Sequence, residues 1–188
     1  MKSIVKNTAI LLVITLIATA ALSFVYSLTK GPIDAAEAEK TRQAYQQVYA
    51  DAAAFKTVDN EAALLQEYNT TLTTGVTVQE VKLAVDAAGT KLGYVFSVIG
   101  KGYKPDLKLA LGVDTTGKVV GYNVISHQET AGYGARCNDP DIKAQFVGIT
   151  DSAQVVDGIS GATRTTNALR NETQAALDLV KRLEGEGV

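Results

Sequence analysis

The sequence is poor in the residues from which proteins build metal centres and disulfides. Its 188 residues include one Cys (Cys137), one His (His127) and no Trp. A structural zinc site needs about four N or S ligands, and an iron–sulfur cluster needs about four thiolates, so neither fits in one chain. Cys137 also has no partner for an internal disulfide. We therefore expect no metal site, and we interpret Cys137 as a buried or half-buried thiol rather than a reactive one.

Clusters of positive charge are missing as well. The chain has 18 Lys and Arg against 20 Asp and Glu, a net charge of −2, and no segment gathers basic residues. Because phosphate backbones are bound by clustered Lys and Arg, nucleic acid is not an expected partner. The hydrophobic content of 46% is sufficient for one globular unit with a core.

One long stretch lacks charge altogether. Between Asn7 and Thr29 there is no Asp, Glu, Lys or Arg, and the segment AILLVITLIATAALSFVYSL is apolar apart from Thr and Ser. Such a helix spans about 30 Å, the thickness of a hydrocarbon core. We predict an N-terminal transmembrane anchor over residues 1–30, in contact with lipid through residues 8–28, and one further domain over residues 31–188.

A cleaved signal peptide is the alternative for this segment. Lys2 and Lys6 precede the apolar run, and ATA at residues 18–20 resembles a cleavage site. The run nevertheless continues through residues 24–26, where a signal peptide turns polar, and this favours a retained anchor. Basic residues also follow the run, so the positive-inside rule leaves the orientation open.

The residues after the anchor predict a second helix. Pro32 suits a first helical turn, Asp34 and Glu37 suit the positive end of a helix, and residues 29–55 are rich in helix formers. Its expected inner face consists of Ala38, Tyr45, Val48, Ala52 and Phe55.

Alternating apolar residues then predict two hairpins. The expected strands are residues 81–85, 92–98, 107–113 and 120–124. AAGT at residues 87–90 and DTTG at residues 114–117 supply the turns. A short helical piece near residues 139–146 and a helix over residues 166–183 complete the pattern, with Leu169, Ala176, Val180 and Leu183 at helical spacing. The fold class is therefore α+β, with an antiparallel sheet packed by helices.

The segment VVDGISGATRTTNAL, residues 155–169, combines small residues with four hydroxyls in front of that helix. A helix cap needs only one hydroxyl. A nucleotide-binding P-loop is disfavoured because its Lys and spacing are absent, and a nucleophilic Ser160 has no neighbouring base. Amides at a helix N-terminus flanked by small residues also suit a phosphate.

Within this segment, DGISGATRT resembles the flavinylation motif of FMN-binding domains, in which FMN is joined through its phosphate to the final Thr or Ser. The resemblance implies a covalent phosphoester at Thr165. It also implies a recognition sequence that consists of Asp157, Ser160, Gly161, Ala162 and Thr163.

A second segment, HQETAGYGAR at residues 127–136, is similar to the His-x-Glu-Thr-Pro-Gly-Leu-Gly segment of the same domain, with Ala131 for Pro and Tyr133 for Leu. It implies that Glu129 and Thr130 contact the flavin ring edge or ribityl chain, and that Tyr133 stacks on the ring. We interpret His127 as structural.

With its single N-terminal span, the whole chain resembles the G subunit of Rnf-type complexes, which move electrons between ferredoxin and NAD and translocate Na⁺ or protons. The resemblance implies an inner (plasma) membrane protein with an extracytoplasmic FMN domain, other membrane subunits as partners, and a flavin transferase for maturation. The chain would be a redox subunit without a complete active site. The alternatives are the C subunit of a Na⁺-translocating NADH:quinone reductase, a stand-alone tethered flavoprotein, and a binding or sensor module in which the motif only caps a helix.

Overall fold

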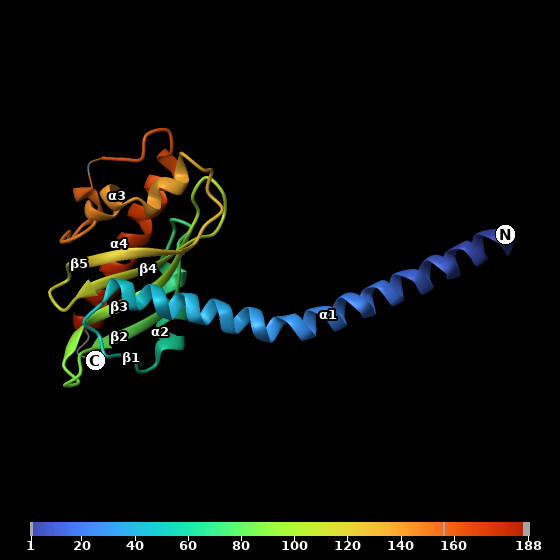
Figure 1. Cartoon of the computed structure of the whole chain (residues 1–188), viewed down its shortest axis with the longest axis horizontal. Helices are drawn as coiled ribbons and strands as arrows, with labels where there is room; N and C mark the ends of the chain where they lie inside the picture. The colour runs from blue at the N-terminus through green and yellow to red at the C-terminus, as the bar shows by residue number, and fades with distance from the viewer. Residues whose placement is uncertain (1, 156, 186–188) are drawn as a thin grey trace. The chain divides into compact units, whose positions relative to one another are not determined.

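A computed structural model describes residues 2–155 and 157–185 (Figure 1). It divides into two compact units, residues 1–40 and residues 41–188. The first unit is formed by helix α1 (Lys2–Val48), which continues into the second unit with Pro32 in its interior. The prediction of a separate helix with Pro32 in its first turn was therefore wrong. A Pro inside a helix costs about 3 kcal/mol, and good helix formers on both sides of Pro32 offset this cost.

The hydroxyl groups of the apolar part of α1 are satisfied within the helix. Thr8 and Thr19 donate to carbonyl groups one turn earlier, at 3.0 and 2.8 Å. Thr15, Ser27 and Thr29 make the same kind of bond. A polar side chain that is bonded to its own backbone does not depend on water. By length and composition, α1 is able to cross a membrane.

The second unit is built on a five-stranded antiparallel sheet in which each strand pairs with its neighbours in sequence. The strands are β1 (Ala54–Thr57), β2 (Thr77–Val85), β3 (Lys91–Gly100), β4 (Leu107–Asp114) and β5 (Val119–Ser126). Both predicted hairpins are confirmed. Asp86 and Asp114 accept backbone N–H bonds in the two turns, as Asp does in tight connections.

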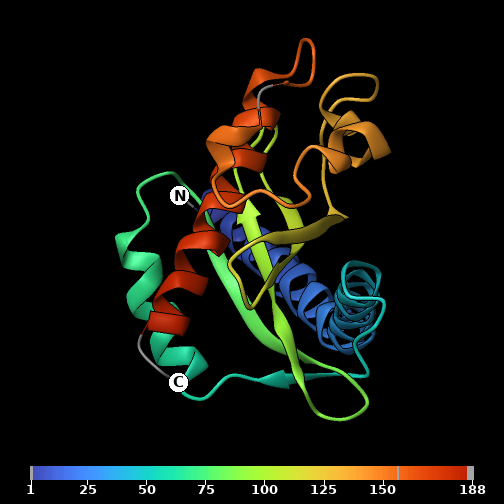
Figure 2. The same cartoon turned by 90° about the vertical axis from the view of Figure 1, so that its left-hand side faces the viewer.

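Helices cover both faces of this sheet. On one face lie α2 (Glu61–Thr71) and α4 (Thr163–Gly185), which run beside each other in Figure 2. The last turns of α1 cover the other face, where Tyr45 and Tyr49 pack against Val95 and Ala110. Strand β3 is therefore buried on both sides, with Phe96 in the larger core and Val95 in the smaller one.

The inner face predicted for the second helix is only partly correct. Tyr45 is buried and Val48 is half-buried, but Ala38 is exposed. Ala52 and Phe55 lie beyond the end of α1, and Phe55 belongs to β1. Gly112 makes room for this end of the helix, because a Cβ there would overlap Val48 and lie 2.8 Å from Tyr49 Cε2.

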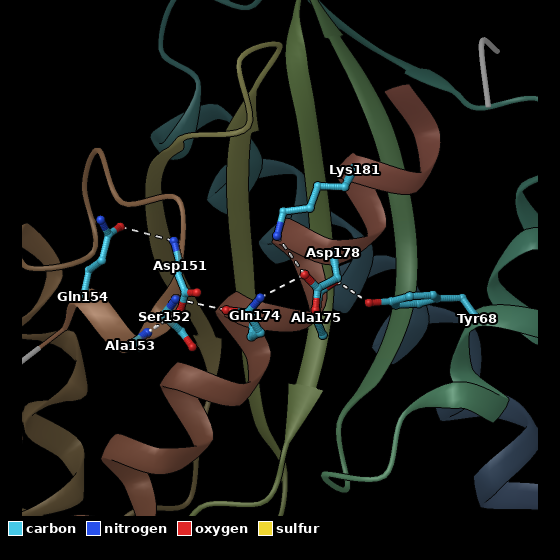
Figure 3. A network of polar contacts seen from close by, with 9 residues as sticks. All are labelled: Tyr68, Asp151, Ser152, Ala153, Gln154, Gln174, Ala175, Asp178 and Lys181. Atoms are coloured by element: carbon cyan, nitrogen blue, oxygen red, sulfur yellow. Dashed lines mark hydrogen bonds and ion pairs between the residues drawn. The ribbon is translucent and has the colours of Figure 1, made fainter. Parts of the chain in front are cut away.

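Polar contacts fix α4 against the rest of the unit (Figure 3). Tyr68 of α2 donates its hydroxyl proton to the carbonyl of Ala175, at 2.7 Å. The amide of Ser152, in the short helix η2 (Ser152–Gln154), donates to Oε1 of Gln174 at 3.0 Å. Contacts on two sides thus hold the middle of α4 in place.

Two more short elements lie along the chain between β5 and η2. They are the 3₁₀ helix η1 (Gly134–Asn138) and the helix α3 (Pro140–Ala144), which confirms the predicted helical piece. Helix α4 begins at Thr163, before the predicted start at residue 166, so Thr165 lies in its first turn. Its predicted inner residues, Leu169, Ala176, Val180 and Leu183, are all buried.

Candidate functional site: a buried hydroxyl and a carboxylate at the start of α4

A cavity of about 430 Å³ lies at the first turn of α4. It is bounded by residues of the β3–β4 connection, of the segment between β5 and η1, and of the start of α4. The lining residues are Tyr103, Glu129, Thr130, Tyr133, Gly134, Gly161, Ala162, Thr163, Arg164 and Thr165. Segments that are distant in sequence therefore meet at one place.

The chemical centre of this cavity is a contact between Thr165 and Glu129. The Thr165 hydroxyl donates to Oε2 of Glu129, with 2.8 Å between the oxygens. Thr165 is fully buried, and Glu129 is only 8% exposed. A hydroxyl bonded to a carboxylate with little water nearby forms one of the stronger hydrogen bonds of proteins.

One backbone amide and the close approach of two glycines fix the position of the Glu129 side chain. Its Oε1 accepts a hydrogen bond from the amide of Lys104 at 3.1 Å, and its own amide donates to Nδ1 of His127 at 3.2 Å. A Cβ at Gly102 would collide with Oε1, and a Cβ at Gly134 would collide with Oε2 and lie 2.7 Å from the Thr165 hydroxyl. The carboxylate thus occupies space that only glycine leaves open. His127 bonds the Glu129 backbone, and its structural role stays an interpretation.

The next hydroxyl along α4 has a separate role. Thr166 Oγ1 accepts a bond from the amide of Ile159 at 2.9 Å and donates to the carbonyl of Ala162 at 3.2 Å. Thr166 therefore ties the preceding loop to the first turn of α4. The Thr165 hydroxyl donates to Glu129 and caps no helix amide among the described residues, so capping does not explain why Thr165 carries a hydroxyl.

All but two of the predicted site residues line the cavity. The exceptions are Asp157 and Ser160, which are exposed and lie outside the lining. The motif resemblance did not name Tyr103, Gly134 or Arg164 as site residues. Gly134 belongs to the HQETAGYGAR segment and Arg164 to the variable position of the motif, whereas no sequence signal marked Tyr103.

Comparison with known proteins shows the family to which the chain belongs. The FMN-binding domain family matches residues 102–178, and the RnfG N-terminal region matches residues 1–48. The G subunit of the ion-translocating oxidoreductase complex of Pasteurella multocida is 30% identical over 193 residues, which cover 94% of each chain. The chain belongs to the family of these G subunits. Another member, from Methanosarcina acetivorans, is 28% identical over 192 residues that cover 98% of each chain.

Two further similarities concern a second complex and a solved structure. The G subunit of the proton-translocating ferredoxin:NAD(+) oxidoreductase complex of Clostridium ljungdahlii is 26% identical over 112 residues, which cover 54% of this chain and 60% of that one. The crystal structure of Shewanella oneidensis NqrC is similar over 72% of this chain and 73% of that one, with 16% identity and a TM-score of 0.47. All residues that line the cavity fall within the part matched by the FMN-binding domain.

The cavity of this protein fits FMN. Its volume lies in the range of about 300–1,000 Å³ that is usual for cofactor sites. Tyr103 and Tyr133, which are 64% and 57% exposed, present aromatic rings for a planar ligand. Gly161 has a φ of +75°, which favours glycine, and a Cβ there would lie 3.0 Å from the Tyr133 ring. A larger residue at this position would therefore crowd the Tyr133 ring. The amides at the start of α4 suit a phosphate.

Two other titratable groups lie in the interior near the site. Burial raises the pKa of the Cys137 thiol to about 11, and the charges of Glu129 and Glu172 add to this effect. Cys137 is fully buried, as the sequence suggested, and it is not a nucleophile at neutral pH. Burial also raises the pKa of Glu172 well above its ordinary value, which the backbone of Gly100 offsets only in part.

Proposed function

We propose that this chain is the electron-carrying subunit of a membrane ion-translocating ferredoxin:NAD oxidoreductase complex, and that its FMN is joined by a phosphoester to the Thr165 hydroxyl. The observation that carries the proposal is the Thr165 side chain, whose hydroxyl lies at the cavity bonded to Glu129, while the Thr166 hydroxyl ties the preceding loop to the helix. A covalent bond through the phosphate leaves the flavin ring itself unmodified for redox chemistry.

The residues around the cavity have distinct roles in this proposal. The first turn of α4 supports the phosphate, and the neighbouring Gly161 and Ala162 keep that end narrow. Tyr133 contacts the flavin ring, and Thr130 offers a hydroxyl and a carbonyl for polar contacts. Bound FMN supplies the capacity to accept and release electrons. The chain itself holds and orients the cofactor and excludes water from its attachment point.

The rest of the proposal concerns the setting of the protein. Residues 8–28 of α1 lie in the lipid bilayer of the inner (plasma) membrane, and the FMN domain lies on the extracytoplasmic side. Its partners are the other membrane subunits of the complex and a flavin transferase that attaches the FMN. Residues 2–40 have no buried side chain, and many of them are large and apolar, which supports contact with lipid.

The test is in-gel flavin fluorescence after full denaturation, with the full chain produced beside a flavin transferase. Thr165→Val keeps the shape of the side chain and removes its hydroxyl, so we expect its band to be dark. Thr165→Ser keeps a hydroxyl and is expected to fluoresce. Fluorescence in Thr165→Val, or a dark wild-type band from a host that flavinylates other proteins, would contradict the linkage. Co-purification with other membrane subunits tests the assignment to a complex.

A further inference from the structure

We propose that Glu129 is the base that accepts the Thr165 proton when the flavin is attached. This inference rests on the proposed linkage at Thr165. The two side chains come from segments 36 residues apart, yet their oxygens lie 2.8 Å apart. Among the residues that the structure describes, no other side chain forms a hydrogen bond with the Thr165 hydroxyl. The fold has therefore placed one carboxylate against the one oxygen that must react.

The attachment chemistry requires such a group. A threonine hydroxyl is a weak nucleophile unless a neighbouring base takes its proton. Ester formation from a free phosphate releases water and is unfavourable in aqueous solution, so the donor must carry FMN in a phosphoanhydride, as a flavin adenine dinucleotide does. Thr165 Oγ1 forms the new bond to the flavin-side phosphorus, and the bond from that phosphorus to the adenylate oxygen breaks. The proton passes to Glu129 Oε2, AMP leaves with the electron pair, and nothing is oxidised or reduced.

The position of Glu129 is fixed before the donor arrives. The Lys104 amide holds Oε1, which leaves Oε2 directed at the hydroxyl. The collisions that a Cβ would cause at Gly102 and Gly134 show how closely the backbone surrounds both oxygens. A base that is held within hydrogen-bond distance and shielded from water is typical of sites that move a proton during a reaction. A carboxylate that only filled space would not need both oxygens held in this way.

The experiment measures the rate at which the full chain in detergent gains covalent FMN from flavin adenine dinucleotide and purified flavin transferase. Intact mass spectrometry follows the reaction, and peptide mapping locates the label. Glu129→Gln keeps the size of the side chain but cannot take the proton, so we expect attachment to slow about 10²- to 10⁴-fold, the usual contribution of a general base. Asp139→Asn, an acid outside the cavity lining, is the matched control and should react at the wild-type rate.

Two measurements separate a chemical role from a structural one. Thermal unfolding should show one cooperative transition in Glu129→Gln as in the wild type, and the fall in the attachment rate should far exceed any fall in the affinity for free FMN. Added formate should partly restore attachment in Glu129→Ala, because a small carboxylate replaces the missing base. If Glu129→Gln fails to fold, Glu129→Asp is compared with Glu129→Ala, and the Asp variant should react faster.

The outcomes distinguish this inference from the proposal on which it rests. A wild-type chain that gains no label, or gains it away from Thr165, defeats the proposed linkage. A wild-type chain labelled at Thr165, together with a Glu129→Gln variant labelled equally fast, overturns the role of Glu129 alone and assigns the base to the transferase. Equal rates for the Asp and Ala variants, or no effect of formate on the Ala variant, also overturn it.

Discussion

Glu172 is a carboxylic acid in the core of the second unit, and its replacement by Gln should change how stability depends on pH. Glu172 is fully buried on α4, and neither carboxyl oxygen has a hydrogen-bond partner of normal geometry among the described residues. A Cβ at Gly100 would lie 2.8 Å from its Cδ, so backbone packs directly against the group. The thiol of Cys137 and the phenol of Tyr122 also lie near enough to interact with it electrostatically.

The sign of the effect follows from the direction of the pKa shift. Burial raises the pKa of Glu172 well above its ordinary value of 4.5, so the folded protein keeps the group neutral where the unfolded chain ionises it. The contribution of Glu172 to stability is therefore fully present below pH 4.5. It falls as the pH rises, by about 1.4 kcal/mol per pH unit, until the pKa of the folded state is passed. Gln does not titrate, so Glu172→Gln should lack this slope and gain on the wild type by about 1.4 kcal/mol for each pH unit between 4.5 and the pKa of the folded state.

The assay is urea unfolding of the full chain in detergent, followed by near-ultraviolet circular dichroism of the tyrosines, at a series of pH values from 4.5 upward. Groups that titrate equally in both proteins cancel in the difference between them. Asp51→Asn, at an exposed acid, is the control and should run parallel to the wild type. Parallel curves for Glu172→Gln and the wild type would show that Glu172 is ionised in the folded state, and would refute the reasoning.

Two other substitutions or treatments have defined outcomes. Gly134→Ala inserts a Cβ that collides with Glu129 Oε2, and a displacement of about 1 Å in a reacting pair costs roughly 10²-fold in rate. The rate of covalent FMN incorporation should therefore fall roughly 10²-fold in Gly134→Ala. Gly121→Ala, with open space around the new Cβ, should incorporate FMN at the wild-type rate. Equal rates for Gly134→Ala and the wild type would contradict the packing argument. The raised pKa of Cys137, about 11, leaves about 0.1% thiolate at pH 8, so iodoacetamide should label the thiol only after denaturation. Rapid labelling of the folded chain would contradict its burial.

The hairpins were predictable because each strand carries its own alternating pattern and each turn carries an Asp that bonds the local backbone. Strand β1 has only four residues, and α2 carries a weak amphipathic pattern, so neither gave a clear signal. The prediction for Pro32 was wrong because a Pro suits the first turn of a helix and can also be tolerated in the interior of a long one. In these cases the local sequence allows two structures, and the surrounding chain decides between them.

At the site, too, some features could be predicted from the local sequence and others depend on long-range contacts. The motif resemblance named Thr165 and Glu129 separately, but their contact depends on how the sheet joins the two segments. The different roles of Thr165 and Thr166 depend on where the first turn of α4 begins. The sequence predicted this start three residues too late, at residue 166 instead of Thr163. Glu172 did leave a sequence signal, since it stands among Leu169 and Ala176 on the inner face of α4, where an acid is out of place.

The placement of Thr165 on α4 bears on how an electron carrier keeps its cofactor at a constant position. Loops that bind ligands are commonly the mobile parts of a protein. Here the proposed attachment point lies on the first turn of a helix whose middle is bonded to Tyr68 on one side and to Ser152 on the other. Leu169, four residues further along α4, is fully buried in the main core. A tether at Thr165 would therefore take its position from the packing of the whole unit, while Tyr133, at the same cavity, is exposed.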